Sequence, residues 1–333
     1  MTVLVTGAAG LLGGHVVDVL RARGTAVRAL VLPSEAVDAA PRLASVGAEV
    51  VIGGFADRHS VEGVNAVVNC AARKGAWGPR AEFDAVNVHG AATLLDAALA
   101  AGARRFVHVS SGCVVGTDFR GMADEDAPFR PEPNPYSRSR IEGERLLRRE
   151  IWERAAPVTI VRPGLLYGPR DTRSFGRFAA LVEAGRMVLI GSGENFVPLS
   201  YVVDVAEGIA RALEAPAAAG RTYFLTSAPV TQRAYLEAIA AALGVAPRFR
   251  RIPYGAARAL AAAAEATTRL LHRPGPPLVT RFGIGLLGGD TRLSIARARA
   301  DLGYEPRIGL EEGVARSVAW YWGRRAVRAL RAA

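Results

Sequence analysis

Lysine is almost absent from this chain. Lys74 is the single lysine among 42 basic residues, and all the others are arginine. The chain is also rich in alanine and glycine, and this pattern is typical of a lysine-poor coding bias. The bias matters wherever a lysine would be expected and an arginine stands instead.

Cysteine and long apolar runs are scarce as well. The two cysteines, Cys70 and Cys113, cannot build a disulfide framework, so a reducing cytoplasm is the expected location. The N-terminal "MTVLVTGAAG" has neither the basic nor the apolar segment of a signal peptide. No uninterrupted apolar run reaches ~18 residues, so no transmembrane segment is expected. No metal site is expected either.

Charge of one sign is not concentrated anywhere. The formal net charge of +11 by itself favours nucleic-acid binding, but the arginines are spread over the whole chain and no nucleic-acid module is recognisable. We therefore expect no nucleic-acid partner. What the chain does contain is 50% hydrophobic residues in 333 positions, enough for the core of one large domain or of two intimate ones.

Short apolar segments rich in β-branched residues alternate with helical patterns up to about residue 170. The expected strands are 2–7, 26–31, 48–54, 65–72, 104–111 and 158–164. Strands that alternate with helices form βαβ units, whose right-handed crossovers bring parallel strands into one sheet. The sequence therefore predicts an α/β fold, a Rossmann-type doubly wound parallel sheet with helices on both faces.

The pattern loosens after this point. We expect residues 1–170 to form a dinucleotide-binding domain, with elements at about 195–228 returning to its sheet. Residues 171–194 and 229–333 are expected to form a smaller, mostly helical substrate-binding domain. Its alanine-rich segment 254–271 is amphipathic, which suits a cover over an apolar ligand, contact with a membrane surface, or ordinary packing.

A glycine-rich segment, "TGAAGLLG" (6–13), follows the first expected strand and opens a helix. Gly7 allows a tight turn, Gly10 lets the backbone approach a pyrophosphate, and Gly13 lets the helix pack closely on the sheet. The helix N-terminus adds free N–H groups and the positive end of a dipole. This context favours a dinucleotide phosphate site over a glycine-rich turn without a ligand.

The end of the second strand commonly distinguishes NAD from NADP, because a carboxylate there binds the ribose 2′-hydroxyl and repels a 2′-phosphate. Val31 and Leu32 occupy this place, and Arg28 lies within the strand. Since nothing here repels the phosphate, the sequence slightly favours NADP(H) over NAD(H).

Several further motifs follow the glycine loop in a fixed order. They are "NCAA" (69–72), "NVHGAATLLDAA" (87–98), "VHVSSGCVVG" (107–116), "PYSRSR" (135–140) and "VRPGLLYGPRD" (161–171). Together with the glycine loop, this series resembles the extended short-chain dehydrogenase/reductase family over nearly the whole chain.

Three other segments are similar to one branch of that family. They are "AARKGAWG" (71–78), "PPLVTRF" (276–282) and "ARADLGYEPRIGLEEGV" (298–314). The branch is that of the 3β-hydroxysteroid dehydrogenases, the sterol C4-decarboxylating dehydrogenases and the bacterial β-keto acid reductases. The resemblance implies an NAD(P)-dependent ketoreductase or secondary alcohol dehydrogenase for a small hydrophobic ketone or alcohol, such as a steroid-, polyketide- or keto-acid-like molecule. Nucleotide-sugar epimerases and dehydratases share the motifs and are the alternative. A homodimer is usual in this family and is expected here.

The same resemblance implies catalytic roles. Tyr136 exchanges a proton with the substrate oxygen, Ser111 holds that oxygen with Ser110 as a neighbouring candidate, and Asn87 and Arg140 complete the set. The implied cofactor contacts are Thr6, Gly7, Ala9, Gly10, Leu11, Leu12, Gly13, Leu32, Asp57, Ala71, Ala72, Tyr136, Arg140, Pro163, Gly164 and Leu166.

Four residues are candidates for contact with the substrate. They are Lys74, Trp77, Cys113 and Tyr201. Plainer roles stay open for three of them: a solvated loop charge for Lys74, ordinary packing for Trp77, and a small buried hydrophobe for Cys113.

Arg140 departs from the family pattern, which has lysine four residues after the tyrosine. The family lysine binds the nicotinamide ribose and lowers the pKa of its tyrosine, because a phenol with a pKa of about 10 suits proton transfer at neutral pH poorly. Arginine at this position lies on the same helix face as Tyr136 and keeps the charge, but it does not release a proton. Three interpretations are open: drift with activity retained, an adapted site, or a redox-inactive protein that binds the dinucleotide.

A second departure follows the third expected strand. The family commonly has Asp-x-x-Asp there, and its first acid contacts adenine. The stretch "GFAD" (54–57) has Gly54 in that place and retains Asp57. Loss of one adenine hydrogen bond would weaken binding by about 1 kcal/mol.

Overall fold

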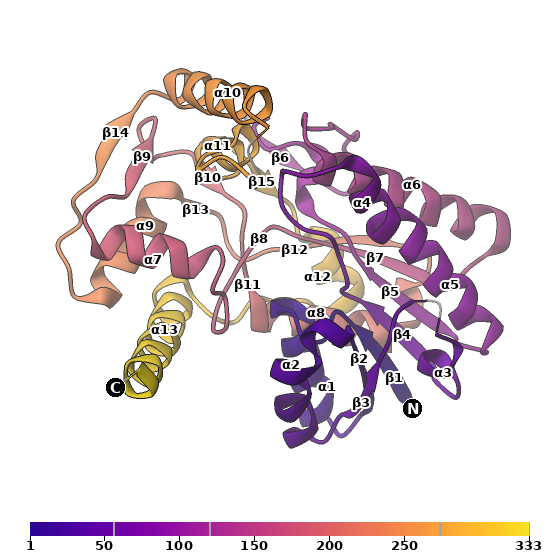
Figure 1. The fold of residues 1–333 in the computed structure, drawn as a ribbon. Helices are drawn as coiled ribbons and strands as arrows, with labels where there is room; N and C mark the ends of the chain where they lie inside the picture. The colour runs from indigo at the N-terminus through magenta and orange to yellow at the C-terminus, as the bar shows by residue number, and fades with distance from the viewer. Residues whose placement is uncertain (56, 120, 273–274, 333) are drawn as a thin grey trace.

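A seven-stranded parallel sheet forms the centre of the protein in a computed structural model that describes residues 1–55, 57–119, 121–272 and 275–332 (Figure 1). The strand order is β12-β7-β5-β4-β1-β2-β3. The strands are β1 (Thr2–Thr6), β2 (Ala26–Val31), β3 (Glu49–Ile52), β4 (Ala66–Asn69), β5 (Arg105–Val109), β7 (Val158–Pro163) and β12 (Thr222–Leu225). The predicted doubly wound sheet is confirmed. Its order reverses between β1 and β4, where open α/β sheets form a ligand crevice at the carboxyl ends of the strands.

Helices cover both faces of the sheet (Figure 1). On one face lie α1 (Leu11–Ala22), α2 (Pro33–Ser45), α8 (Val202–Glu214) and α12 (Ala296–Leu302), and on the other lie α3 (Arg58–Val61), α5 (Ala91–Ala100) and α6 (Pro135–Arg154). The side chains of β1 alternate between these faces, as in any strand. Val3 and Val5 join one hydrophobic cluster, and Leu4 joins the other.

The elements between about residues 195 and 228 pair with different parts of the chain. β12 pairs with β7, and α8 packs against α1. β11 (Leu199–Tyr201) instead pairs with β8 (Leu165–Tyr167), and β10 (Phe196–Val197) pairs with β13 (Val230–Thr231). These short ladders lie outside the seven-stranded sheet.

A third hydrophobic cluster lies beside the sheet and is built mainly from α7 (Phe175–Glu183), α9 (Gln232–Leu243) and α13 (Leu310–Ala332). Its centre is aromatic: the ring of Tyr167 meets Tyr201 at 5.5 Å and Tyr235 at 5.7 Å, both edge-on. β9 (Val188–Ile190) pairs with β14 (Arg250–Ile252) at its margin. The helices α10 (Tyr254–Leu270) and α11 (Arg281–Gly288) continue this part above the sheet in Figure 1.

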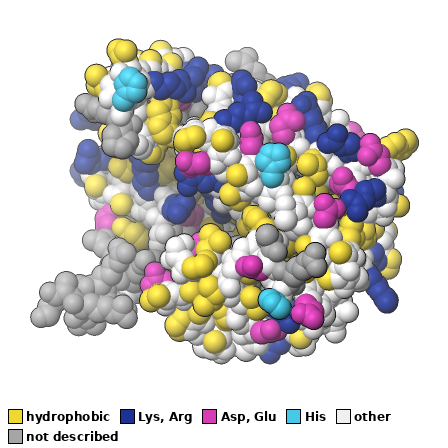
Figure 2. All heavy atoms as spheres, turned by 45° about the vertical axis from the view of Figure 1, so that its right-hand side comes forward, with side chains coloured by type: hydrophobic (Ala, Val, Ile, Leu, Met, Phe, Trp, Pro, Cys, Tyr) yellow, Lys and Arg dark blue, Asp and Glu magenta, His cyan; other side chains and the backbone are white. Residues whose placement is uncertain are grey.

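Shorter elements complete the chain. They are α4 (Arg80–Asp84), a π-helical turn at Ala85–Gly90, 3-10 turns at Gly112–Val115 and Pro216–Ala218, and the ladder of β6 (Met122–Ala123) with β15 (Arg292–Leu293). None of the helices in the described ranges has the length and apolar character needed to cross a membrane. On the face shown in Figure 2, arginine and acidic side chains are interspersed. Leu260, Leu270 and Leu271 on and after α10 are exposed, and contact of this region with a membrane surface stays a prediction.

Candidate active site

A cavity of about 840 Å³ opens at the carboxyl ends of β1, β4 and β5. The glycine loop forms one end of it, and α11 together with the segment after β8 forms the other. Of the cofactor contacts that the sequence predicts, the following line the cavity: Thr6, Gly7, Ala9, Gly10, Leu11, Leu32, Ala71, Ala72, Tyr136, Gly164 and Leu166. Leu12, Gly13 and Pro163 are buried behind this wall.

The glycine loop is a tight cradle of backbone. Gly7 has φ +61°, and a Cβ there would lie 2.8 Å from the Ala71 nitrogen. A Cβ on Gly13 would lie 2.2 Å from the Gly7 oxygen, so α1 packs directly on the loop. Gly10 is the N-cap of α1 and supplies no side-chain cap. The first-turn N–H groups can therefore serve an anion, and the cradle fits a dinucleotide pyrophosphate.

The adenosine end differs from expectation. Asp57 is not among the described residues that line the cavity; its carboxylate accepts a hydrogen bond from the Gly54 nitrogen at 2.7 Å and holds the turn after β3. Phe55 and Glu35 line the cavity instead. Glu35 stands in the first turn of α2, where its carboxylate accepts a 3.4 Å hydrogen bond from the Leu32 nitrogen.

The sequence pattern at the end of β2 does not point to Glu35, because this acid lies beyond the strand, in the first turn of α2. A signal was present: Glu35 follows the N-cap Leu32 by three residues, and an acid at that spacing commonly reaches back to the N-cap nitrogen of its helix. The cap brings this carboxylate toward the end of β2.

Tyr136 lies at the start of α6 and lines the cavity. Asn134 fixes this helix start, because its side chain accepts a 2.8 Å hydrogen bond from the Ser137 nitrogen. The Tyr136 ring meets Phe282 of α11 edge-on at 6.1 Å. The phenol is therefore held between the sheet region and α11.

The two serines after β5 have different surroundings. Ser110 is buried and donates to Glu144, whose carboxylate pairs with the fully buried guanidinium of Arg162 at 2.7 Å. Ser111 lines the cavity, and its hydroxyl accepts a 3.3 Å hydrogen bond from the Cys113 nitrogen. Of the two candidates, Ser111 is the serine that lines the cavity.

Arg140 is buried behind the cavity rather than in its wall. One terminal nitrogen, Nη1, donates to the Val109 carbonyl at 3.1 Å, and the guanidinium carbon lies 5.3 Å from the centre of the Tyr136 ring. The Nε–H has no hydrogen-bond partner among the described residues. Arginine thus keeps a positive charge against the phenol ring, but its bonding is directed at the end of β5.

Asn87 is also buried and does not line the cavity. Its side chain holds the backbone of Arg73 twice, accepting from the nitrogen at 2.9 Å and donating to the oxygen at 3.0 Å. It donates as well to the Ser139 hydroxyl at 2.8 Å, and that hydroxyl donates to the Tyr136 carbonyl at 2.9 Å. Asn87 therefore joins the loop after β4 to the helix of Tyr136.

Lys74 follows Arg73 in this loop and lines the cavity. The residue as a whole is exposed, but the protein around its amine lowers the pKa by desolvation, and the charge of Arg140 lowers that pKa further. No hydrogen bond or ion pair links the amine to any residue within the described ranges.

Of the other predicted substrate contacts, one lines the cavity and the others pack elsewhere in the protein. Cys113 lines the cavity, and burial raises the pKa of its thiol to about 11, so it is a neutral surface there. The guanidinium carbon of Arg269 lies 4.9 Å from the centre of the Trp77 ring, and this contact joins the loop after β4 to α10. Tyr201 is packed in the aromatic cluster, away from the cavity.

The segment after β8 and the region around α11 supply further residues of the cavity wall, which the sequence analysis did not name individually. They are Leu165, Arg170, Asp171, Thr172, Arg173, Ser174, Phe282, Leu286 and Thr291. The Asp171 carboxylate accepts hydrogen bonds from the backbone nitrogens of Arg173, Ser174 and Phe175 at 3.0, 2.9 and 2.9 Å. Because α7 begins at Phe175, Asp171 caps this helix rather than standing in the wall as a free acid.

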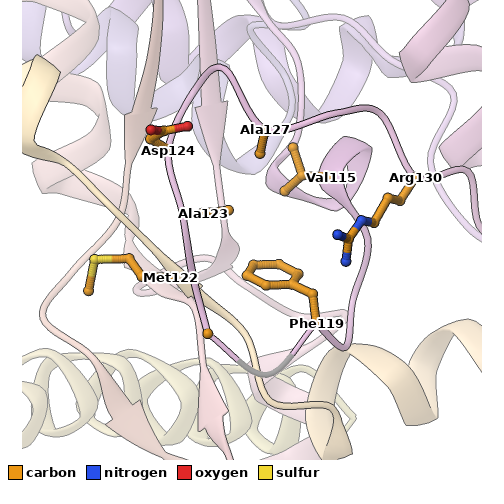
Figure 3. A pocket seen from close by; sticks show the side chains of 8 residues that line it. Val115, Phe119, Met122, Ala123, Asp124, Ala127 and Arg130 are labelled. Atoms are coloured by element: carbon orange, nitrogen blue, oxygen red, sulfur yellow. The ribbon is translucent and has the colours of Figure 1, made fainter.

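A second, smaller hollow of about 260 Å³ lies in the loop between Val115 and Arg130 (Figure 3). Figure 3 shows Arg130 reaching toward Phe119, and the guanidinium carbon lies 5.9 Å from the centre of that ring. Met122 points away on the other side and is exposed. This hollow contains neither the glycine loop nor Tyr136, both of which line the larger cavity.

The comparisons with known proteins agree with this geometry. The sequence profile of the NAD dependent epimerase/dehydratase family matches residues 3–225. A 4-hydroxy-2-methyl-3-oxo-4-farnesyl-3,4-dihydroquinoline-1-oxide ketoreductase of Stigmatella aurantiaca is 31% identical over 322 residues, covering 94% of this chain and 95% of the relative. A 2-alkyl-3-oxoalkanoate reductase of Stenotrophomonas maltophilia is 31% identical over 331 residues, covering 95% of this chain and 98% of the relative.

Among solved structures, the chain is similar to the UDP-glucuronic acid 4-epimerase of Bacillus cereus in complex with NAD. The TM-score is 0.77 at 19% identity, covering 97% of this chain and 99% of the other. A likeness at this identity shows the fold alone. The family profile and the two reductases carry the assignment: the chain belongs to the NAD-dependent epimerase/dehydratase family of extended short-chain dehydrogenases/reductases and is an NAD(P)-dependent oxidoreductase.

Proposed function

We propose that the protein is a ketoreductase, or in reverse a secondary alcohol dehydrogenase, for a hydrophobic substrate. The observation that carries the proposal is that Tyr136 and Ser111 share one cavity with the glycine loop. At the far end of this cavity, Leu165, Phe282 and Leu286 offer an apolar wall. The ketoreductase and oxoalkanoate reductase names of the two relatives support a ketone substrate.

The side chains of the cavity suggest their roles. Ser111 orients the carbonyl oxygen by a hydrogen bond, and Tyr136 donates the phenolic proton to that oxygen as charge develops on it. The reduced nicotinamide, when bound, supplies the hydride that the carbonyl carbon accepts. The guanidinium carbon of Arg140 lies 5.3 Å from the centre of the Tyr136 ring, so the site places a positive charge beside the phenol.

We propose NAD(H) rather than NADP(H) as the cofactor. The sequence alone slightly favours NADP(H), since no acid ends β2. Glu35 changes that balance because its carboxylate lines the cavity beside Leu32. A carboxylate here accepts hydrogen bonds from ribose hydroxyls and repels a 2′-phosphate.

The part of the chain around α7, α9, α10 and α11 is proposed to bind the substrate, and the sheet with its flanking helices to bind the dinucleotide. A homodimer stays a prediction. The alternative function is that of a nucleotide-sugar epimerase. The likeness to the solved epimerase shows the fold alone, so a substrate screen must separate the two functions.

The proposal is tested by binding first and turnover second. Calorimetric titration should show micromolar binding of NADH and weaker binding of NADPH. A screen of 3-oxo acids, steroid ketones, polyketide-like ketones and nucleotide sugars should then give reduction of a hydrophobic ketone. Tyr136→Phe should lower kcat by about 10²–10⁴-fold while NADH binding is kept. Turnover of nucleotide sugars alone, or no dinucleotide binding at millimolar concentration, would overturn the proposal.

A further inference from the structure

We propose that Lys74 is the amine that serves Tyr136 in this site: it returns to the phenolate the proton that the phenol gives to the substrate. The inference rests on the proposed function and concerns a residue on a different element from Arg140. It assigns a proton-exchange role to the loop after β4.

Arg140 is unsuited to that role for two structural reasons. Its guanidinium is buried behind the cavity wall and donates to the Val109 carbonyl at 3.1 Å. An arginine also stays protonated at all ordinary pH values, so it supplies charge without exchanging a proton. The site therefore has a fixed positive charge at Arg140, and proton exchange with Tyr136 is left to other groups of the cavity.

Lys74 stands in the same cavity as the phenol, and hydrogen bonds fix its loop against the helix of Tyr136. Asn87 holds both backbone groups of Arg73, the neighbour of Lys74, at 2.9 and 3.0 Å. The same amide donates to Ser139, which in turn donates to the Tyr136 carbonyl. One buried amide therefore joins the backbone next to Lys74 to the backbone of Tyr136.

The surroundings of the amine suit a proton carrier. Charged and titratable groups come to it from three elements: Arg140 of α6, Cys70 after β4, and Asp171 and Arg173 after β8. Burial and the charge of Arg140 lower the pKa of Lys74. Asp171 is occupied as a helix cap, and no carboxylate of the described residues pairs with the amine. The ammonium form is therefore easier to deprotonate here than in water.

The step balances in protons. In reduction, the O–H bond of Tyr136 breaks and an O–H bond forms on the substrate oxygen. The ammonium of Lys74 then gives one proton to the phenolate and becomes a neutral amine. A proton from bulk solvent then restores the ammonium, so each reduction consumes one hydride and one solvent proton. In the oxidation direction every transfer runs the other way.

Because the chain has a single lysine, its titration can be followed directly. In protein labelled with ¹³C at the ε-carbon of lysine, one side-chain signal reports Lys74, and we expect its midpoint below the ordinary value of about 10.4. Addition of NADH should move this signal. An ordinary midpoint that NADH leaves unchanged overturns the proposal.

Kinetics separates proton exchange from simple charge. Lys74→Met and Lys74→Arg should both lower kcat by about 100-fold. Wild-type reduction should decline as pH rises through the Lys74 midpoint, because the ammonium is then lost, and Lys74→Arg should lack that decline. Arg138→Met, an exposed change on α6, is the control and should leave kcat and its pH profile unchanged.

The outcomes are distinct. Full activity of Lys74→Arg would mean that only charge is needed and overturns the proton role. A rise in KM confined to carboxylate-bearing ketones, with kcat unchanged, would make Lys74 a substrate anchor and also overturns it. If wild type bound no NADH, the proposed function itself would fail, whereas NADH binding with active Lys74→Met would defeat this inference alone.

Discussion

The two ends of the cavity differ in the groups that form them: backbone at one end and side chains at the other. At the phosphate end the chain uses backbone: a Cβ at Gly7 or Gly13 would lie within 3 Å of backbone atoms, and α1 begins directly after Gly10. At the chemical end it uses side chains from separate elements, among them Ser111, Tyr136 and Lys74. A backbone cradle tolerates few substitutions, whereas a side-chain constellation can keep a charge while changing the residue that carries it.

The charges differ in the same way. A carboxylate, Glu35, lines the adenosine end, while Lys74, Arg173 and Asp171, whose carboxylate is bonded to backbone N–H groups, line the substrate end and Arg140 lies behind it. This distribution favours a ribose with free hydroxyls at one end and developing negative charge on oxygen at the other. Changes at each end should therefore affect different measured quantities.

Gly13→Ala should have the largest effect, at the phosphate end. Its Cβ would lie 2.2 Å from the Gly7 oxygen, so α1 or the loop must move. We expect a loss of about 1–3 kcal/mol in the free energy of unfolding and NADH binding weaker by about tenfold or more, as calorimetry would show. Gly255→Ala in α10, where no atom lies within 4 Å of the new Cβ, is the control. If Gly13→Ala bound NADH like wild type, the backbone-cradle description would be wrong.

Glu35→Gln tests the charge difference between the ends. We expect the ratio of NADPH to NADH affinity to rise by about tenfold, or ~1.4 kcal/mol, because a neutral amide no longer repels the 2′-phosphate. Glu35→Arg should extend the same trend. Glu62→Gln, at an exposed acid outside the cavity wall, is the matched control. An unchanged ratio in Glu35→Arg would remove Glu35 from cofactor selection.

Arg140→Lys should have the smallest effect. Lysine keeps a positive charge but loses the planar group beside the Tyr136 ring and the bond to the Val109 carbonyl. We expect kcat to change by less than about tenfold and the unfolding free energy to fall by about 1 kcal/mol. A large gain in kcat would instead identify Arg140 as a decayed catalytic position and would weaken the case for Lys74.

Much of the fold followed from local patterns. The alternation of β-branched strands with helices predicted the sheet, and the spacing of the glycines placed the cradle at its first turn. Within 195–228, β12 pairs with β7, whereas β10 and β11 form separate ladders. Short strands of two or three residues carry little periodicity, so their partners depend on tertiary contacts.

In the candidate site as well, some residues were placed by a sequence motif and others only by tertiary contacts. Tyr136 and Ser111 were placed by motif, but Ser110 was separated from Ser111 only by its buried bond to Glu144. Asp57 and Tyr201 were expected at the ligand, and the structure uses them in a turn and in an aromatic core. Glu35 and Phe282 reach the cavity from a helix cap and from a helix near the end of the chain.

The sequence by itself determined the doubly wound sheet, the glycine cradle and the positions of Tyr136 and Arg140 on one helix face. Those features depend on residues close together in the chain, whose spacing fixes their geometry. Only the tertiary structure decided that Arg140 is directed at the Val109 carbonyl and that Lys74 shares the cavity with Tyr136. The physical reason is that a buried amide, Asn87, joins two segments distant in sequence, and no local pattern records where such a bond will form.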